Sequence, residues 1–147
     1  MTIRFYKVNE AHGCFSNFSP HPVEIDGRTW PTNEHFFQAQ KFAGTRHEEE
    51  IRQASSPMIA ARMGRSRERP LRKEWEQIKD ELMRKAVRAK MQQHQDVREE
   101  LLATGEEQLV EATTKDDYWG CGADGKGQNR LGQILMQVRE ELRVGAR

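Results

Sequence analysis

One acidic residue has surroundings that suit catalysis. Glu34 lies one or two positions inside a predicted helix and is followed closely by Phe36 and Phe37. An acid in the first turn of a helix stabilises the helix dipole by about 0.3–1 kcal/mol, so a structural role is one interpretation. Aromatic walls, in contrast, would disfavour the charged form and raise the pKa of Glu34 toward the range of a general acid or base. The position alone leaves both interpretations open.

A second candidate region is the glycine-rich segment 113–130. Asp116 and Asp117 precede a Tyr-Trp pair that ends at Trp119, and a loop with Lys126 then leads into a predicted helix that Asn129 would cap. Glycines let backbone N–H groups approach an anion, and a helix N-terminus favours one. The segment is no Walker loop, because Lys126 is followed by glycine and not by Ser or Thr. A surface turn around a buried Trp is the alternative.

A basic run precedes the longest predicted helix. Its members are Arg62, Arg65, Arg67, Arg69, Arg72 and Lys73. Such a run is usually a solvated face, but Arg also offers a planar fork of donors to phosphate oxygens. Acids at positions 68, 74 and 76 dilute it, which suits one small phosphate better than a polyanion. Trp75 follows on the apolar stripe of the helix, where it would pack in the core or stack on a flat heterocycle.

Composition and motifs exclude several classes of protein. The 24 basic and 23 acidic residues leave a net charge of +1, which argues against strong duplex nucleic-acid binding. No apolar stretch predicts a membrane span, and the N-terminal residues 1–13 lack the apolar core of a secretory signal, so we expect a cytoplasmic protein. The two cysteines, Cys14 and Cys121, form no CxxC pair, and the histidines lack HExxH spacing. We therefore expect neither a metal nor a cofactor.

The elements that must position these residues are mostly helices. Hydrophobic spacing and caps predict helices over about 33–43, 46–54, 57–64, 70–94, 96–104 and 130–142. Thr32 or Asn33 would cap the first of these helices, and Ser56-Pro57 would open the third. Strands are expected at 3–8, at 23–25 and 28–30 around an Asp26-Gly27 turn, and at 109–110. The sequence thus predicts an α+β fold that is predominantly α-helical, with a few short strands. One compact domain spans 1–147, with its core at about 4–142.

Several blocks of sequence together resemble one family. They are 15–18 (FSNF), 30–42 (WPTNEHFFQAQKF), 56–65, 72–75, 116–120 and 125–132 (GKGQNRLG). In this order they resemble the NADAR family, in its YbiA-like branch, over about residues 4–142. The resemblance implies a compact, mainly helical fold and N-glycosidase activity. The implied substrates are phosphoribosylamino-pyrimidine intermediates of riboflavin biosynthesis, which yield ribose 5-phosphate and an aminopyrimidine.

The resemblance also implies which residues act. The Glu, Trp and Asp that are important for activity in the family match Glu34, Trp75 and Asp116. Asp117 is an alternative to Asp116, because the two acids are adjacent. Asp116 is preferred, because it stands three residues before Trp119. Cleavage of an N-glycoside builds oxocarbenium-like charge, which Glu34 would stabilise, or Glu34 would activate water. Asp116 would orient the sugar hydroxyls or protonate the leaving amine, and Trp75 or Trp119 would stack on the base.

The substrate-binding set is broader. The predicted residues are Phe15, Ser16, Asn17, Arg62, Arg65, Trp119, Gly120, Lys126 and Asn129. Arg62, Arg65 or Lys126 would take the phosphate. A Schiff base on Lys126 or Lys7 is a further option that the spacing does not require.

Three other functions remain as alternatives. Some members of the family remove ADP-ribose from guanine bases in nucleic acid, so an ADP-ribosylated guanine is a second candidate substrate. A non-catalytic module that binds ADP-ribose or a nucleotide would show saturable binding without release of a base. A helical scaffold that docks a partner would tolerate substitution of Glu34 and Asp116.

Overall fold

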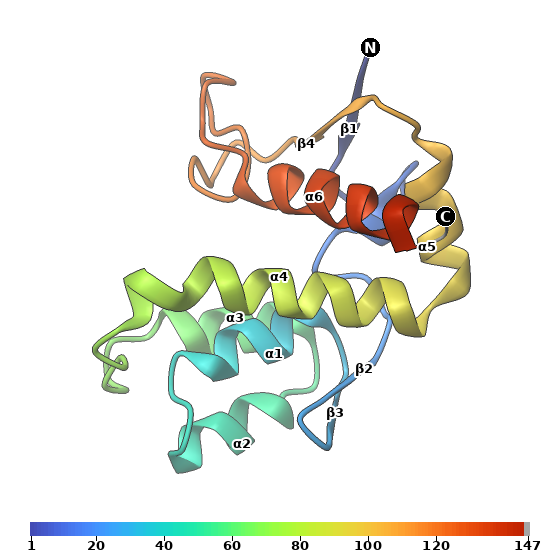
Figure 1. Ribbon diagram of the computed structural model, residues 1–147. Coiled ribbons are helices and arrows are strands. Elements are labelled where there is room, and N and C mark those ends of the chain that lie inside the picture. The colour runs from blue at the N-terminus through green and yellow to red at the C-terminus, as the bar shows by residue number, and fades with distance from the viewer. Residues whose placement is uncertain (146–147) are drawn as a thin grey trace.

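The fold is helical, with α4 running through the middle of the molecule (Figure 1). The structure, a computed structural model, describes residues 1–145; residues 146 and 147, at the end of the predicted domain, lie outside the described part. α6 lies on one side of α4, and α1, α2 and α3 lie on the other. The helices are α1 (Asn33–Gln40), α2 (Arg46–Arg52), α3 (Pro57–Arg65), α4 (Trp75–Gln93), α5 (Gln95–Ala103) and α6 (Arg130–Gly145), with a short 3-10 helix η1 (Gly13–Phe15).

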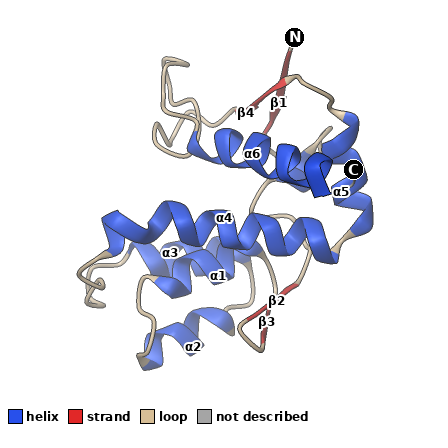
Figure 2. Cartoon of the chain, viewed as in Figure 1, coloured by secondary structure: helices blue, strands red, loops and turns tan. Residues whose placement is uncertain are grey.

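Four short strands form two separate pairs (Figure 2). β2 (Val23–Ile25) and β3 (Arg28–Trp30) form the hairpin that the Asp26-Gly27 turn predicts; both turn residues have positive φ, as a type I′ turn requires. β1 (Thr2–Phe5) pairs in parallel with β4 (Gln108–Glu111). This second pairing joins the N-terminal strand to a strand that lies far along the chain, and no local pattern in the sequence indicates it.

Capping residues set the start of two helices as the sequence predicts. The Thr32 hydroxyl accepts the backbone N–H of His35 at 3.2 Å and so caps α1. The Ser56 hydroxyl accepts the backbone N–H of Ile59 at 3.1 Å and caps α3, whose first helical residue is Pro57. α1 therefore begins one residue before Glu34, which places that carboxyl in the first turn.

The prediction that the longest helix starts near Pro70 is wrong. α4 begins only at Trp75, and 66–74 form an irregular segment. The reason is a tertiary contact: the Arg72 backbone N–H donates to the carbonyl of Lys41 at 3.0 Å, and its guanidinium donates to the carbonyl of Gln40 at 3.2 Å. These bonds fasten the segment to the end of α1 and replace the bonds that a helix would make.

The predicted cap of the last helix is also different. Asn129 lies in the left-handed region with φ 51°. Its side-chain Oδ1 accepts the backbone N–H of Glu111 at 3.0 Å, and its Nδ2 donates to the carbonyl of Leu109 at 2.9 Å. The Asn129 side chain therefore anchors the start of α6 to β4.

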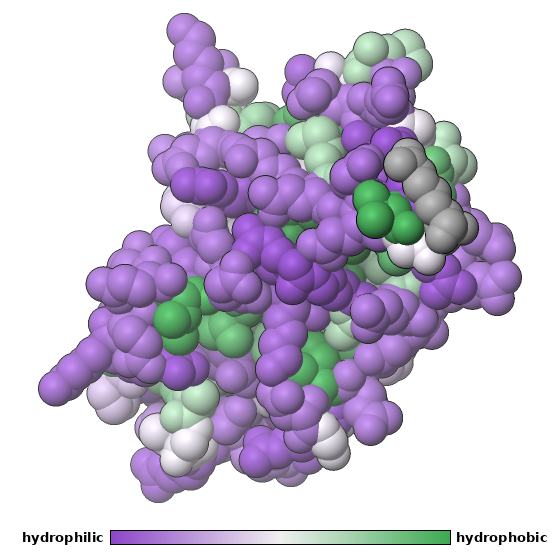
Figure 3. Space-filling model, in the orientation of Figure 1, coloured by the Kyte–Doolittle hydropathy of each residue, from purple (hydrophilic) through white to green (hydrophobic). Residues whose placement is uncertain are grey.

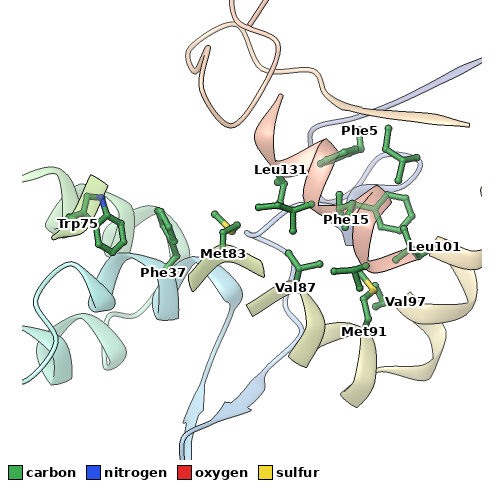
Figure 4. Packing of buried hydrophobic residues seen from close by; sticks show 14 residues of the cluster. Phe5, Phe15, Phe37, Trp75, Met83, Val87, Met91, Val97, Leu101 and Leu131 are labelled. Atoms are coloured by element: carbon green, nitrogen blue, oxygen red, sulfur yellow. The ribbon is translucent and has the colours of Figure 1, made fainter. Parts of the chain in front are cut away.

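Two hydrophobic clusters flank α1 and α4. The larger is built from β1, α4, α5, β4 and α6 and includes Phe37 and Trp75 (Figure 4). The smaller surrounds Trp30 and Phe36. Adjacent phenylalanines of α1 thus enter different clusters, so α1 is held on two sides and its remaining face is left to polar residues.

The fold class is confirmed: helices hold about half of the chain, and the strands are few and short. The face seen in Figure 3 is mainly hydrophilic, with small and scattered hydrophobic areas. Within residues 1–145, no helix combines the length and apolar character that a membrane crossing demands.

Candidate active site

One stripe of α1 carries the polar groups of the site. Glu34, Gln38 and Lys41 are spaced by four and three residues, so they lie on one face of the helix, and all three are buried. Gln38 Nε2 donates to Glu34 Oε2 at 2.8 Å. The Glu34 backbone N–H donates to the carbonyl of Asn17 at 3.1 Å, which ties the predicted 15–18 motif to the start of α1.

Burial dominates the electrostatics of Glu34. Only 8% of Glu34 is exposed, and desolvation raises its pKa above the usual range. Three effects act in the opposite direction: the Gln38 hydrogen bond and the positive charges of Lys41 and Arg65. Asp116 raises the pKa of Glu34 further. Glu34 is therefore an enclosed carboxyl between two cations and a second acid.

Lys41 is a site residue that the sequence interpretation did not single out. Its Nζ donates to the carbonyl of Gly64 at 3.3 Å and lies 5.9 Å from the centroid of the Trp75 ring. Burial, followed by the nearby charge of Arg67, lowers its pKa to about 8, although Glu34 acts to raise it. A buried lysine with such a pKa is partly a neutral amine near pH 7. The one indication in the sequence was the spacing of residues 34, 38 and 41, which places all three on the same face of a helix.

Aromatic rings cover the site. Phe37 lies 5.1 Å from Trp75 and 5.2 Å from Trp119, measured between ring centroids. Figure 4 shows the Phe37 and Trp75 rings side by side at one end of the larger cluster. Trp75 is 4% exposed, and Trp119 is half-buried. Both predicted indoles thus converge on a phenylalanine one turn from Glu34.

The loop between β4 and α6 brings Asp116 to Glu34. Asp116 Oδ1 accepts the backbone N–H groups of Tyr118 at 2.9 Å and Trp119 at 2.8 Å, which shapes the turn. Tyr118 donates its hydroxyl to Asp80 of α4 at 2.5 Å, and Lys79 Nζ lies 3.9 Å from the Tyr118 ring centroid. These contacts hold the loop against the start of α4.

Of the two adjacent acids, Asp116 is among the groups that act most strongly on the pKa of Glu34. Asp117 is exposed, and its Cβ lies against Gly122.

Glu111, at the end of β4, is a third acid near the site. It is close enough to both Asp116 and Glu34 for each charge to act on it, and burial together with these two charges raises its pKa to about 7. The sequence interpretation missed Glu111, because a strand of four residues gives no sign of which helix it will face.

The basic residues divide into near and distant groups. Arg65 affects the pKa of both Glu34 and Lys41, and Arg67 and Lys79 also act on Lys41. Arg67 donates to the same Gly64 carbonyl as Lys41, at 3.2 Å. Lys126 is exposed, as is Arg62 on α3, and neither is among the groups that act most strongly on the pKa of Glu34 or Lys41. Arg65 is therefore the predicted phosphate ligand that lies nearest the carboxyl.

Some predicted binding residues have structural partners. Phe15 is buried in the larger cluster, with its ring edge-on to Phe5 at 5.8 Å. The Ser16 carbonyl accepts Lys90 Nζ at 2.9 Å, and Lys90 also donates to the Ser19 hydroxyl at 2.6 Å. Gly120 is buried, and a Cβ there would meet Thr113 and the carbonyl of Glu111. Lys7, considered for a Schiff base, is exposed.

Buried amides around Glu34 retain unused hydrogen-bonding capacity. Among residues 1–145, the side-chain atoms Asn17 Oδ1 and Gln38 Oε1, and both amide atoms of Asn33, are buried without a hydrogen-bond partner. Buried polar atoms normally have partners. All three residues lie within or beside the first turns of α1, which is where a polar ligand or water would satisfy them.

The arrangement is suited to acid and base chemistry. A shielded carboxyl, an amine of lowered pKa and two indoles lie together, with arginines at the rim. Within the described part of the chain, no three His, Cys, Asp or Glu residues form a group that could hold a metal ion. The side chains can stabilise positive charge, transfer protons and hold a flat ring without help from a metal.

Comparisons with known proteins agree with this chemistry. Residues 4–143 match the NADAR domain family. The chain is 56% identical over 142 residues to "N-glycosidase YbiA" of Escherichia coli (strain K12), covering 97% of this chain and 89% of the relative. It is 43% identical over 144 residues to "Riboflavin biosynthesis protein VVA0006" of Vibrio vulnificus (strain YJ016), covering 98% of this chain and 39% of that protein.

A solved structure has the same fold. The NMR structure of the E. coli protein YbiA superposes with a TM-score of 0.91 at 54% identity, covering 99% of this chain and 89% of the other. The resemblance inferred from the sequence motifs is thereby confirmed.

Proposed function

Because the chain belongs to the NADAR family, we propose that its N-glycosidase activity acts on phosphoribosylamino-pyrimidines, intermediates of riboflavin biosynthesis. The enzyme is a hydrolase of N-glycosyl bonds, as its relatives named N-glycosidase are. The reaction yields ribose 5-phosphate and an aminopyrimidine. One observation carries the proposal: the buried Glu34 carboxyl lies near the Lys41 amine, and that amine lies 5.9 Å from the centroid of the Trp75 indole.

Glu34 stabilises the transition state. As the C1′–N bond stretches, positive charge accumulates on C1′ and the ring oxygen of the ribose. A carboxylate already held in a water-excluded site stabilises that charge without reorganisation. The Gln38 amide, which donates to Glu34 Oε2, fixes the orientation of this carboxylate.

The rings hold the leaving base. Stacking on an aromatic face contributes about 1–3 kcal/mol per base. Trp75 and Trp119 both contact Phe37, which lies one helical turn from Glu34, and the half-buried Trp119 is the indole more open to a pyrimidine. The unused amide atoms of Asn17, Asn33 and Gln38 are available for the polar edges of the substrate.

A Schiff base is the alternative to direct addition of water at C1′, and Lys41 replaces Lys126 and Lys7 as the candidate for it. The neutral amine would add to C1 of the ring-opened sugar and expel the base as a free amine, leaving an imine on Lys41 that water hydrolyses. Its pKa of about 8 supports this role, because an ordinary lysine offers little neutral amine near pH 7. Borohydride reduction during turnover would add the sugar mass to a peptide that contains Lys41.

The phosphate of the substrate is assigned to Arg65 and Arg67. Both lie near enough to Lys41 to lower its pKa, so a phosphate at this rim would leave the sugar within reach of the site. We place the reaction in the cytoplasm, which suits the free thiols of Cys14 and Cys121. The name of the Vibrio vulnificus relative supports the link to riboflavin intermediates.

The decisive experiment offers the purified protein two substrates at equal concentration. One is a phosphoribosylamino-pyrimidine, and the other is an ADP-ribosylated guanine. Release of ribose 5-phosphate from the first at the higher kcat/KM supports the proposal. Preference for the second makes the protein an ADP-ribosyl-guanine hydrolase, and saturable binding without release of either base makes it a binding module.

A further inference from the structure

Glu111 is held in place by bonds from three directions. It pairs with Phe5 across the parallel β1–β4 ladder. Its backbone N–H donates to Asn129 Oδ1 at 3.0 Å, and its carbonyl accepts the backbone N–H of Cys121 at 3.0 Å. A Cβ on Gly120 would lie 2.9 Å from the Glu111 carbonyl and 3.2 Å from that of Asp116, so the loop packs directly over the end of β4.

The carboxyl of Glu111 has acidic neighbours only. Glu34 of α1 and Asp116 of the loop both act on it, and no positive charge does. On the β1 side its partner is the apolar Phe5, and at the start of α6 the Arg130 guanidinium lies 3.8 Å from Asp80. Within residues 1–145, the Glu111 carboxyl forms no hydrogen bond or ion pair. Nothing nearby therefore stabilises its charged form.

Glu34 and Glu111 have opposite surroundings. Glu34 accepts a hydrogen bond from Gln38 and lies near Lys41 and Arg65, all of which favour its ionised form. Glu111 has none of these partners, and its pKa is raised to about 7 by burial and by the two acids. Burial raises the pKa of both carboxyls, but only Glu34 has partners that favour its ionised form, so Glu111 is the better placed of the two to hold a proton.

We propose that Glu111 is the general acid of the reaction and donates its proton to the nitrogen of the leaving base. This assignment rests on the proposed function. The C1′–N bond breaks with its electron pair going to nitrogen, the Glu111 proton goes to the same nitrogen, and Glu34 stabilises the cationic sugar. Water then adds to C1′, and its proton returns to the Glu111 carboxylate, which restores the enzyme.

Asp116 is less suited to this step. Its Oδ1 offers lone pairs to the N–H groups of both Tyr118 and Trp119, so that oxygen is engaged in shaping the loop. Asp116 therefore shapes the loop, and its negative charge disfavours the ionised form of Glu111. The three acids form no metal site among the described residues, which leaves Glu111 free to carry a proton.

The test compares Glu111→Gln with Glu106→Gln, the same change at an exposed acid just before β4. With a phosphoribosylamino-pyrimidine, Glu111→Gln is expected to lower kcat by about 10²–10⁴-fold, the usual contribution of a general acid. Glu106→Gln should leave kcat unchanged. Wild-type kcat should fall as the pH rises through about 7, because the proton is lost there, and Glu111→Gln should lack this descending limb.

Two results would overturn the role of Glu111. One is a Glu111→Gln enzyme as fast as the wild type, and the other is a slow variant that keeps the descending limb. If the variant does not fold, the wild-type profile decides alone, and a rate that does not fall near pH 7 refutes the assignment. A wild-type enzyme that releases no ribose 5-phosphate from this substrate refutes the proposed function itself, which distinguishes the two failures.

Discussion

Two buried lysines show how differently one residue type is used in this molecule. Lys41 and Lys90 are both buried, and burial lowers both pKa values, to about 8 and about 7. Lys90 donates two hydrogen bonds, of 2.9 and 2.6 Å, to the Ser16 carbonyl and the Ser19 hydroxyl, and no acid affects its pKa except the thiol of Cys14. Lys41 makes one bond of 3.3 Å and faces a carboxyl, three cations and an indole.

The partners of the two amines distinguish a lysine that holds the fold together from a lysine that lies in the candidate site. The hydrogen bonds of Lys90 fix the loop that leads into the β2–β3 hairpin, so the role of this amine is structural. Lys41 lies where opposing charges and unsatisfied amides meet, a combination that folding alone does not require. A perturbed pKa by itself would not have distinguished the two, whereas their partners do.

The largest effect on turnover is expected from removing the carboxyl beside Lys41. Glu34→Gln should lower kcat by about 10²–10⁴-fold, because the charge that stabilises the cationic sugar is lost. Substrate binding should remain nearly intact, since the shape is preserved. Release of ribose 5-phosphate in single turnovers, with binding followed by tryptophan fluorescence, measures both. Wild-type turnover by Glu34→Gln would refute the role of Glu34.

Replacing each lysine by methionine tests the comparison directly. Lys41→Met should lower kcat by about 10²-fold, the scale on which one electrostatic partner acts in a closed site. Its thermal midpoint should change little, because the Gly64 carbonyl keeps the Arg67 donor and Glu34, whose pKa is already raised, can take up a proton when the cation is lost. Activity and melting curves of the same preparation measure the two effects.

Lys90→Met should show the reverse pattern. The Ser16 carbonyl and the Ser19 hydroxyl lose their donor, which costs about 1–3 kcal/mol for each buried group left unsatisfied. The folded fraction should keep its kcat. If Lys90→Met lost activity without a lower midpoint, or Lys41→Met lost stability without lower activity, the division between the two lysines would be wrong.

A smaller effect should follow from crowding the site. A Cβ at Gly64 would collide with the Gln38 side chain, so Gly64→Ala should displace Gln38 from Glu34. We expect kcat to fall about tenfold, which corresponds to the loss of about 1.4 kcal/mol. Gly44→Ala is no control, because Gly44 has positive φ, whereas Gly145→Ala meets no neighbour and should have no effect. An unchanged kcat in Gly64→Ala would show that Gln38 does not orient Glu34.

A last expected effect concerns stability rather than turnover, through the pH dependence of unfolding. The pKa of Lys90 falls from 10.5 to about 7 on folding, so the unfolded chain binds more protons between these values. Stability should therefore rise with pH above about 7, and Lys90→Met should lose this contribution. Melting curves of both proteins across this range provide the measurement. Parallel curves for wild type and variant would mean that Lys90 titrates normally.

Local sequence determined much of this structure. Thr32 and Ser56 capped their helices as predicted, and the Asp26-Gly27 turn formed its hairpin, because each depends on neighbours within four residues. Glu34, Trp75 and Trp119 were found in the same way, since acids and indoles within a helix turn or loop are visible in the chain. The motifs also identified the family.

Only the tertiary structure decided what these elements face. The parallel pairing of β1 with β4 places Glu111 beside Asp116, and the bonds of Arg72 to the end of α1 delay the start of α4. Phe15 proved to be a core residue, while Lys41, unremarkable in the sequence, faces Glu34 and Trp75. Each depends on contacts between segments tens of residues apart. Such contacts form because packing gains outweigh the entropy of closing long loops, and local pattern does not encode that balance.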